Sequence, residues 1–101
     1  MATIASEKST SGLGPWVQIG RDVDPGIGNL YIVEVSGTFN STTVDIVARK
    51  PGGATLGLGL EAGAIDTNRA VLLEIPNGYE VNINVTGTPT SLNATIEGYR
   101  V

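Results

Sequence analysis

The 101-residue chain contains no cysteine and no histidine. Their absence excludes disulfide bonds, thiolate or imidazole metal ligands, a cysteine nucleophile and a histidine general base. Aromatic residues are scarce as well, at 5% of the sequence, so a hydrophobic core has to be built mainly from aliphatic side chains. We therefore expect a protein without a cofactor and without a metal held by nitrogen or sulfur ligands.

Basic residues and long apolar runs are also missing. Six Lys and Arg residues face ten Asp and Glu residues, which gives a net charge of −4. Nucleic-acid binding normally needs a basic stripe to displace counterions, and here only Arg49 and Lys50 are adjacent. No run approaches the roughly 18 apolar residues of a membrane span, and no signal-peptide pattern follows Met1. We expect a soluble protein that binds neither nucleic acid nor membranes.

Alternating apolar and polar residues predict β-strands along most of the chain. The alternation is clearest in residues 69–85, where two alternating segments flank the loop 76–78. A three-residue loop with a G1 bulge keeps both apolar sets on one face and sets Leu73 opposite Val81. We predict a β-hairpin here, with a final strand over residues 92–101 pairing with its second arm.

The same reasoning predicts a second hairpin, in which Ala48 faces Leu56. Its second strand, residues 55–60, is unusual because Gly57 and Gly59 leave one of its faces without side chains. Alternate glycines in a strand favour either a corner where the sheet folds over or close contact with another subunit. Both interpretations remain open at this point.

The N-terminal residues 1–14 are small and polar, with Ile4 and Leu13 as their apolar anchors. Such a segment is either a frayed terminus or an arm that becomes ordered on a neighbouring subunit. Trp16 follows it at the start of the first expected strand, where it would serve as a core or interface anchor. We expect an extended N-terminal arm over residues 1–14, followed by one domain over residues 15–101.

A turn-rich loop over residues 21–29 carries the pair Asp22 and Asp24. The spacing of these carboxylates and Gly26 resembles a calcium-binding loop, but the position that should supply a bidentate Glu is Val33. We therefore predict a solvated loop without a metal. Two carboxylates could in principle hydrolyse a glycoside, but a chain of this size cannot build a deep cleft around them, so we expect no enzyme.

Seven to eight short strands separated by turn signals predict an all-β domain, either a sandwich or a small barrel. We favour an antiparallel β-sandwich that is jelly-roll-like, with the loops 21–29 and 61–68 carrying the chain between sheets. The expected strand 30–39 begins with apolar residues on both faces, which favours cover by the opposite sheet and by another segment or subunit. Because few charges blunt the open edges, we expect a homo-oligomer or a partner that covers an edge.

Three segments carry a resemblance to a known group of proteins: VSGTFNSTTVDIV at residues 35–47, IPNGY at residues 75–79 and TPTSLNATIEGYR at residues 88–100. In their strand and turn composition they resemble small β-sandwich virion proteins of tailed bacteriophages, some of which decorate or cement the capsid. The resemblance covers residues 30–101. It implies a non-enzymatic protein of the capsid surface that binds the major capsid protein and forms trimers or dimers.

Under that hypothesis, the residues expected to contact a partner are the anchors of the arm, the tryptophan, the loop carboxylates and the glycine face: Ile4, Leu13, Trp16, Asp22, Asp24, Gly57 and Gly59. The alternative is a tail, fibre or carbohydrate-binding module, in which exposed aromatic rings would stack on sugars. Trp16 and Tyr99 would serve this purpose, whereas Tyr31 and Tyr79 are expected to face inward.

Overall fold

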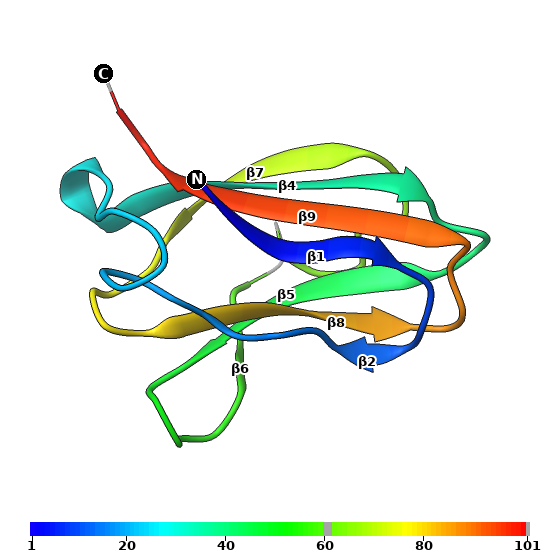
Figure 1. The fold of residues 1–101 in the computed structure, drawn as a ribbon, viewed down its shortest axis with the longest axis horizontal. Helices are drawn as coiled ribbons and strands as arrows, with labels where there is room; N and C mark the ends of the chain where they lie inside the picture. The colour runs from blue at the N-terminus through cyan, green and yellow to red at the C-terminus, as the bar shows by residue number, and fades with distance from the viewer. Residues whose placement is uncertain (60–61, 101) are drawn as a thin grey trace.

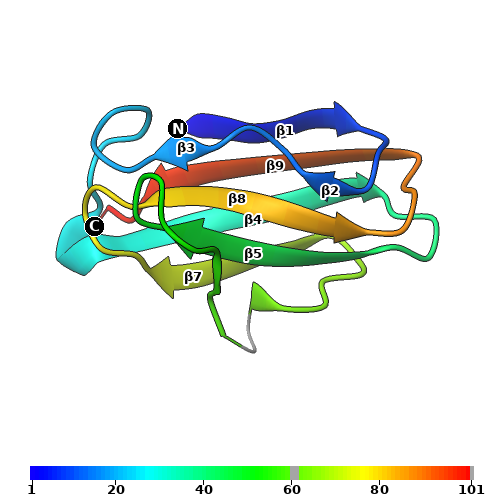
Figure 2. The same cartoon turned by 90° about the horizontal axis from the view of Figure 1, so that it is seen from below.

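The computed structural model describes residues 1–59 and 62–100 and consists of two antiparallel sheets packed as a sandwich (Figures 1 and 2). Sheet A has four strands in the order β1 (Ala2–Lys8), β9 (Ser91–Gly98), β4 (Leu30–Thr38) and β7 (Arg69–Glu74). Sheet B has five: β2 (Gly12–Leu13), β8 (Glu80–Thr86), β5 (Thr43–Arg49) and β6 (Leu56–Gly57) in that order, with β3 (Val17–Gln18) pairing β8. The predicted all-β antiparallel sandwich is confirmed. The strand count exceeds the expectation because β2, β3 and β6 span two residues each.

Alternation along the strands builds the core between the sheets. On β4, Tyr31, Val33 and Val35 are at most 1% exposed, while their neighbours Ile32 and Glu34 face outward. The remaining strands contribute mainly aliphatic side chains, because the period of two sends every second residue inward. The 3-10 turn η1 (Ile27–Asn29) precedes β4. In the part of the chain that is described, no helix is long and apolar enough to cross a membrane.

The hairpin predicted over residues 69–85 is wrong. Leu73 on β7 pairs with Tyr31 in sheet A, whereas Val81 on β8 pairs with Ala48 in sheet B. The turn at residues 76–78 therefore carries the chain from one sheet to the other. The alternation identifies which side chains are buried, but inward faces can meet across the core as well as side by side in one sheet.

The predicted pairing of the last strand with β8 is also wrong, because β9 lies between β1 and β4 in sheet A. There it aligns Ala94 with Val35 and Ile96 with Val33. The strand ends at Gly98, and Val101 of the expected range lies outside the described residues. The connections β4–β5, β7–β8 and β8–β9 each cross from one sheet to the other. Strands that follow one another in the sequence therefore mostly lie in different sheets.

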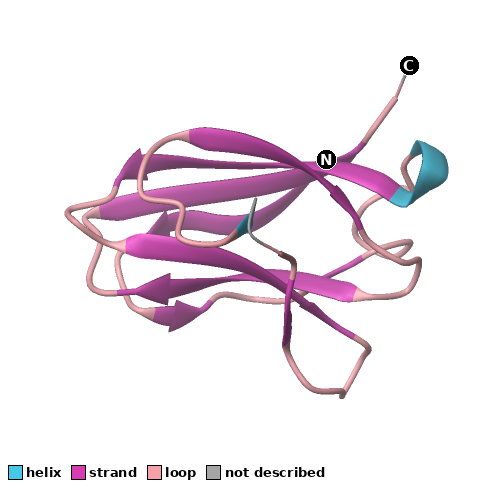
Figure 3. Cartoon of the chain, turned by 180° about the vertical axis from the view of Figure 1, so that it is seen from behind, coloured by secondary structure: helices cyan, strands magenta, loops and turns pink. Residues whose placement is uncertain are grey.

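The second predicted hairpin is confirmed, with Ala48 opposite Leu56. It projects from sheet B with β6 on its returning arm (Figure 3). Leu56 nevertheless remains 55% exposed. Leu60, which belonged to the expected strand, and Glu61 of the expected loop lie outside the described residues.

The structure does not confirm the expected N-terminal arm. Strand β1 pairs with β9, and its Ile4 is completely buried in the core. Leu13 continues the chain into sheet B by pairing with Asn84 of β8. A largely polar segment therefore belongs to both sheets, and burial of Ile4 and Ala5 in the core stabilises its edge strand.

Candidate functional site

The first candidate surface is the outer face of sheet B, where side chains form a row at the start of β8. Gln18 of β3 and Arg49 of β5 both lie opposite Glu80 of β8. The next residue on β8, Val81, points into the core, so this row of three points outward. It brings together segments that are far apart in the sequence.

Trp16, just before β3, contacts this row. The guanidinium carbon of Arg49 lies 4.0 Å from the centroid of the Trp16 ring, and Arg49 Nε donates a hydrogen bond of 3.0 Å to Glu80 Oε1. The side chains of Arg49 and Glu80 are 27% and 12% exposed, so solvent screens this ion pair only partly. The cation–π contact and the charged hydrogen bond together fix the guanidinium over the ring.

Asn82 positions the segment that carries Trp16. This completely buried residue of β8 accepts a hydrogen bond of 3.1 Å from the Gly14 N–H and donates one of 2.6 Å to the Gly14 carbonyl. It thereby replaces the backbone pairing that is interrupted between β2 and β3. The fit is tight, because a Cβ added at Gly14 would lie 3.2 Å from the Ile4 carbonyl oxygen.

The structure brings three of the residues expected from the sequence to this outer face. Leu13, which is 45% exposed, lies opposite the outward-facing Asn84, and Gly57 lies opposite the outward-facing Val47. With Trp16 they form what we call the sheet B face, completed by Arg49 and Glu80: Leu13, Trp16, Arg49, Gly57 and Glu80.

The other expected residues lie elsewhere. Ile4 is completely buried in the core, so it can meet a partner only if β1 detaches from the domain. Gly59 follows β6 with a φ of +96°, and a Cβ added at this glycine, or at Gly57, would meet no atom of the described chain within 4 Å. The expected close contact at these two glycines is therefore not made within the described part of the chain.

The carboxylates of the loop 21–29 have separate environments. Asp22 accepts the Gln18 N–H at 2.8 Å and pairs with Arg21 Nη2 at 2.6 Å. The Arg21 hydrogen bond and, to a smaller extent, the Gln18 N–H lower the pKa of Asp22 below its ordinary value. Asp24 is 92% exposed, and its Oδ2 lies 4.0 Å from Arg100 Nη2. Asp22 therefore stabilises the turn after β3 through hydrogen bonds, while the carboxylate of Asp24 faces solvent.

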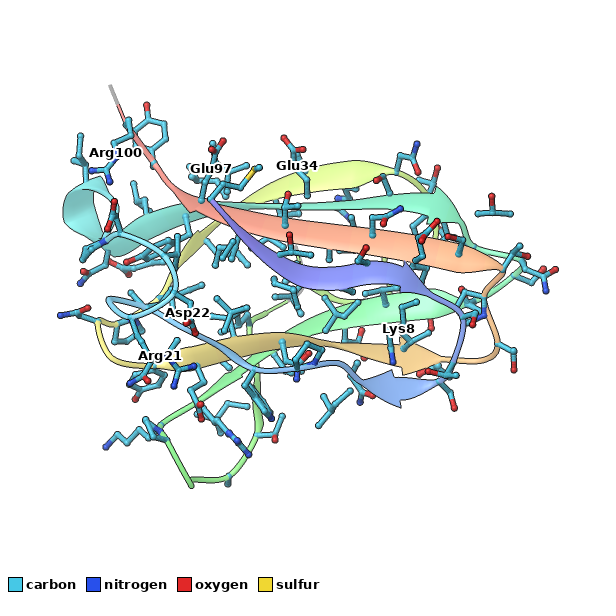
Figure 4. The ribbon with its side chains drawn as sticks, viewed as in Figure 1. Lys8, Arg21, Asp22, Glu34, Glu97 and Arg100 are labelled. Atoms are coloured by element: carbon cyan, nitrogen blue, oxygen red, sulfur yellow. The ribbon has the colours of Figure 1, made fainter. Side chains whose placement is uncertain are left out.

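A second outward surface lies on sheet A. Ile32 of β4 stands between Leu72 of β7 and Glu97 of β9, and Leu72 is 49% exposed. Glu34 and Glu97 project outward on this side of the sheet (Figure 4). The sequence contained one signal for this surface, the apolar residues on both faces at the start of β4. The contribution of Leu72 to this surface was missed, because the sequence prediction paired β7 with β8 and not with β4.

The candidate site is thus a pair of surfaces. Among residues 1–59 and 62–100 there is no pocket and no group of three acidic side chains that could hold a metal ion. Partners of such surfaces bind mainly through a few well-held aromatic and arginine side chains. Comparison with known proteins gives no relative: no family model, no curated protein and no solved structure matches this chain.

Proposed function

We propose that this protein is a non-enzymatic structural protein of a phage virion. In this role it is a capsid decoration or cement protein, which binds the major capsid protein on the capsid surface and stabilises the shell. The composition of residues 35–47, 75–79 and 88–100, which resembles small virion proteins of tailed bacteriophages, supports this proposal. The ordered aromatic and arginine side chains of the sheet B face also support it.

The finer fold that we propose is a jelly roll. The strand order supports it, because the pairings are nested: β1 with β9, β2 and β3 with β8, β4 with β7, and β5 with β6. Wrapping a long antiparallel hairpin around a barrel axis produces this nesting. Jelly rolls occur in viral capsid proteins and in lectins, so the same order supports both the capsid role and its alternative.

The observation that carries the proposal is the Trp16–Arg49 pair on the sheet B face. Tryptophan and arginine are the residue types most often found where binding energy is concentrated. The guanidinium carbon lies 4.0 Å from the ring centroid, and the hydrogen bond from Arg49 Nε to Glu80 also holds the arginine in place. Because these side chains are already ordered, binding would cost little further side-chain entropy.

Symmetry would multiply such a contact. A capsid presents the same site many times, and each oligomer of a decoration protein that spans two subunits links them. Contacts that are weak singly then hold the lattice together. A shallow surface such as the sheet B face is sufficient for this purpose, because shell stabilisation requires binding without chemistry.

The alternative is a tail, fibre or carbohydrate-binding role, and one observation favours it. Trp16 is a partly exposed aromatic ring beside polar groups, which is how many proteins hold a sugar. Tyr31 is completely buried and cannot take part, and Tyr79 packs against the core. A glycan site would therefore centre on Trp16, with Tyr99 as a further partly exposed ring.

The test mixes the purified protein with expanded phage capsids that lack it and measures retention and stoichiometry by sedimentation. We expect saturable binding at a fixed ratio to the major capsid protein. Trp16→Ala should weaken this binding about tenfold or more. Leu56→Ala should leave it unchanged, because this exposed leucine lies opposite the buried Ala48 and so on the other face of β6 from Gly57.

Absence of binding would overturn the capsid role, and binding that is equally strong with Trp16→Ala would overturn the assigned surface. If the protein does not sediment with capsids, titration with a panel of glycans tests the alternative. Binding of a sugar by the unaltered protein, lost in Trp16→Ala, would then identify a carbohydrate-binding module.

A further inference from the structure

The edges of the two sheets differ in how well they are protected. In sheet A, β1 has register shifts after Thr3 and after Ala5, and the backbone at Gly14 approaches it closely. In sheet B, the edge strands β2, β3 and β6 span two residues each. Strand β7 is different, because its six residues pair with β4 in one unbroken register. Figure 2 shows it at the margin of sheet A opposite β1.

Backbone groups of β7 point away from the sheet at this margin. The Ile75 N–H donates to the Asn29 carbonyl at 2.9 Å, so Ile75 and every second residue before it, Leu73 and Val71, direct their backbone groups towards β4. Because these groups alternate in an antiparallel ladder, Ala70, Leu72 and Glu74 direct their N–H and C=O groups outward. No hydrogen bond joins these groups to another residue of the described chain.

The segment between β6 and β7 does not close this edge within the described residues. Its Ile65 instead pairs with Val44 of β5, through two backbone hydrogen bonds of 2.8 and 2.9 Å. The side chains of Ala70, Leu72 and Glu74 are all exposed. A regular edge with unpaired backbone groups and an exposed leucine is a ready template for another strand.

We propose that β7 pairs with β7 of a second copy of this chain, antiparallel about a two-fold axis at Leu72. In this register Leu72 lies opposite Leu72 of the second copy, and Ala70 lies opposite Glu74 of the second copy. Every outward-pointing backbone group of these residues then has a partner. Sheet A continues through the axis into sheet A of the other copy.

Two features favour a second copy over a foreign strand. The register is self-complementary, since each Glu74 meets an alanine and no like charges are opposed. It also joins the outward apolar pair Ile32 and Leu72 of one copy to the same pair of the other. The exposed Leu72 is then covered.

The dimer goes beyond the virion role and does not depend on it, because its tests use the isolated protein. Cysteine crosslinking tests the register directly, since the chain has no cysteine of its own. Directly opposed residues of a hydrogen-bonded pair have Cα atoms about 5.5 Å apart, within the range that a disulfide spans. Only a residue on the two-fold axis lies opposite the same residue of the second copy.

Leu72→Cys should therefore form a disulfide-linked dimer under mild oxidation. Ala70→Cys and Glu74→Cys should each stay uncrosslinked alone but form a mixed dimer when combined. A Leu72→Cys protein that stays monomeric, or equal crosslinking of all three single variants, would overturn the proposed register.

Sedimentation velocity over a wide concentration range tests the dimer without oxidation. We expect the unaltered protein to form a reversible dimer, and Leu72→Lys to raise its dissociation constant about tenfold or more, because two ammonium groups then meet at the axis. Leu56→Lys is the matched control, a similarly exposed leucine on another edge, and should dimerise normally. A monomer at all concentrations, a trimer, or a dimer insensitive to Leu72→Lys would overturn the proposal.

Amide hydrogen exchange supplies a third readout at single residues. The amides of Val71 and Leu73 bond to β4 and should be protected in monomer and dimer alike, whereas those of Ala70 and Leu72 should become protected only as the dimer forms. Protection that does not depend on protein concentration would contradict the inference.

Discussion

The side-chain amide of Asn82 makes two hydrogen bonds to the backbone of Gly14, one with the N–H and one with the carbonyl. Because Asn82 is completely buried, its amide could not be satisfied by bulk water. This contact joins the first segment of sheet B to the middle of β8. It also sets the place of Trp16, two residues beyond Gly14, on the sheet B face.

Replacement of Asn82 should therefore destabilise the fold. Asn82→Ala leaves the Gly14 N–H and carbonyl without partners, and we expect a loss of about 1–3 kcal/mol in the free energy of unfolding, measured by urea denaturation. Asn84→Ala is the matched control, because Asn84 is exposed on the same face of the same strand. Its effect should stay within about 0.5 kcal/mol. Equal effects of the two variants would contradict the structural role of Asn82.

The hydroxyl group of Tyr31 is buried in the core without a hydrogen-bond partner among the described residues. Because an unsatisfied buried hydroxyl loses its hydration without compensation, Tyr31→Phe should maintain or increase stability, by up to about 1 kcal/mol. Thermal and urea denaturation both measure this difference. A loss larger than about 1 kcal/mol would show that the hydroxyl is bonded in solution.

Two glycines should respond oppositely to alanine. A Cβ at Gly26 would overlap the Leu30 carbonyl oxygen, so Gly26→Ala should cost about 3 kcal/mol of stability. A Cβ at Gly57 would meet no described atom within 4 Å, so Gly57→Ala should be neutral or stabilise by up to about 1 kcal/mol. If Gly57→Ala keeps its stability but loses capsid binding, this glycine contacts the partner.

The acid sensitivity of the loop after β3 should depend on Asp22. Because folding lowers its pKa, its ionised form stabilises the fold at neutral pH, and this contribution is lost as the pH falls below the ordinary value of 3.8 towards the lowered one. The stability difference between the unaltered protein and Asp22→Asn should therefore be present at pH 7 and shrink in acid. Asp24→Asn controls for the removal of one charge from the same loop. A difference that grows in acid would contradict this assignment.

The sequence predicted which side chains are buried better than it predicted which strands are neighbours. The alternation around Leu73 and Val81 correctly placed both residues in the core. It could not reveal that β4 and β5, distant in sequence, compete successfully to pair with these strands. The hairpin that places Ala48 opposite Leu56 was predicted correctly because its pairing is local.

The same limit applied to the candidate site. Trp16 and Leu13 were selected from residue type alone, as apolar side chains in a polar segment. Arg49 and Glu80 could not be selected, because their contact exists only where β5 and β8 lie side by side. The unpaired edge of β7 was likewise missed, because the predicted hairpin paired this strand with β8, whereas it pairs with β4.

Image reconstruction of capsids saturated with the purified protein tests the central claim most directly. We predict density for the sandwich at fixed positions of the capsid lattice, with the sheet B face and Trp16 directed at the major capsid protein. Capsids that carry no additional density, or bound copies whose sheet B face points into solvent, would contradict the account.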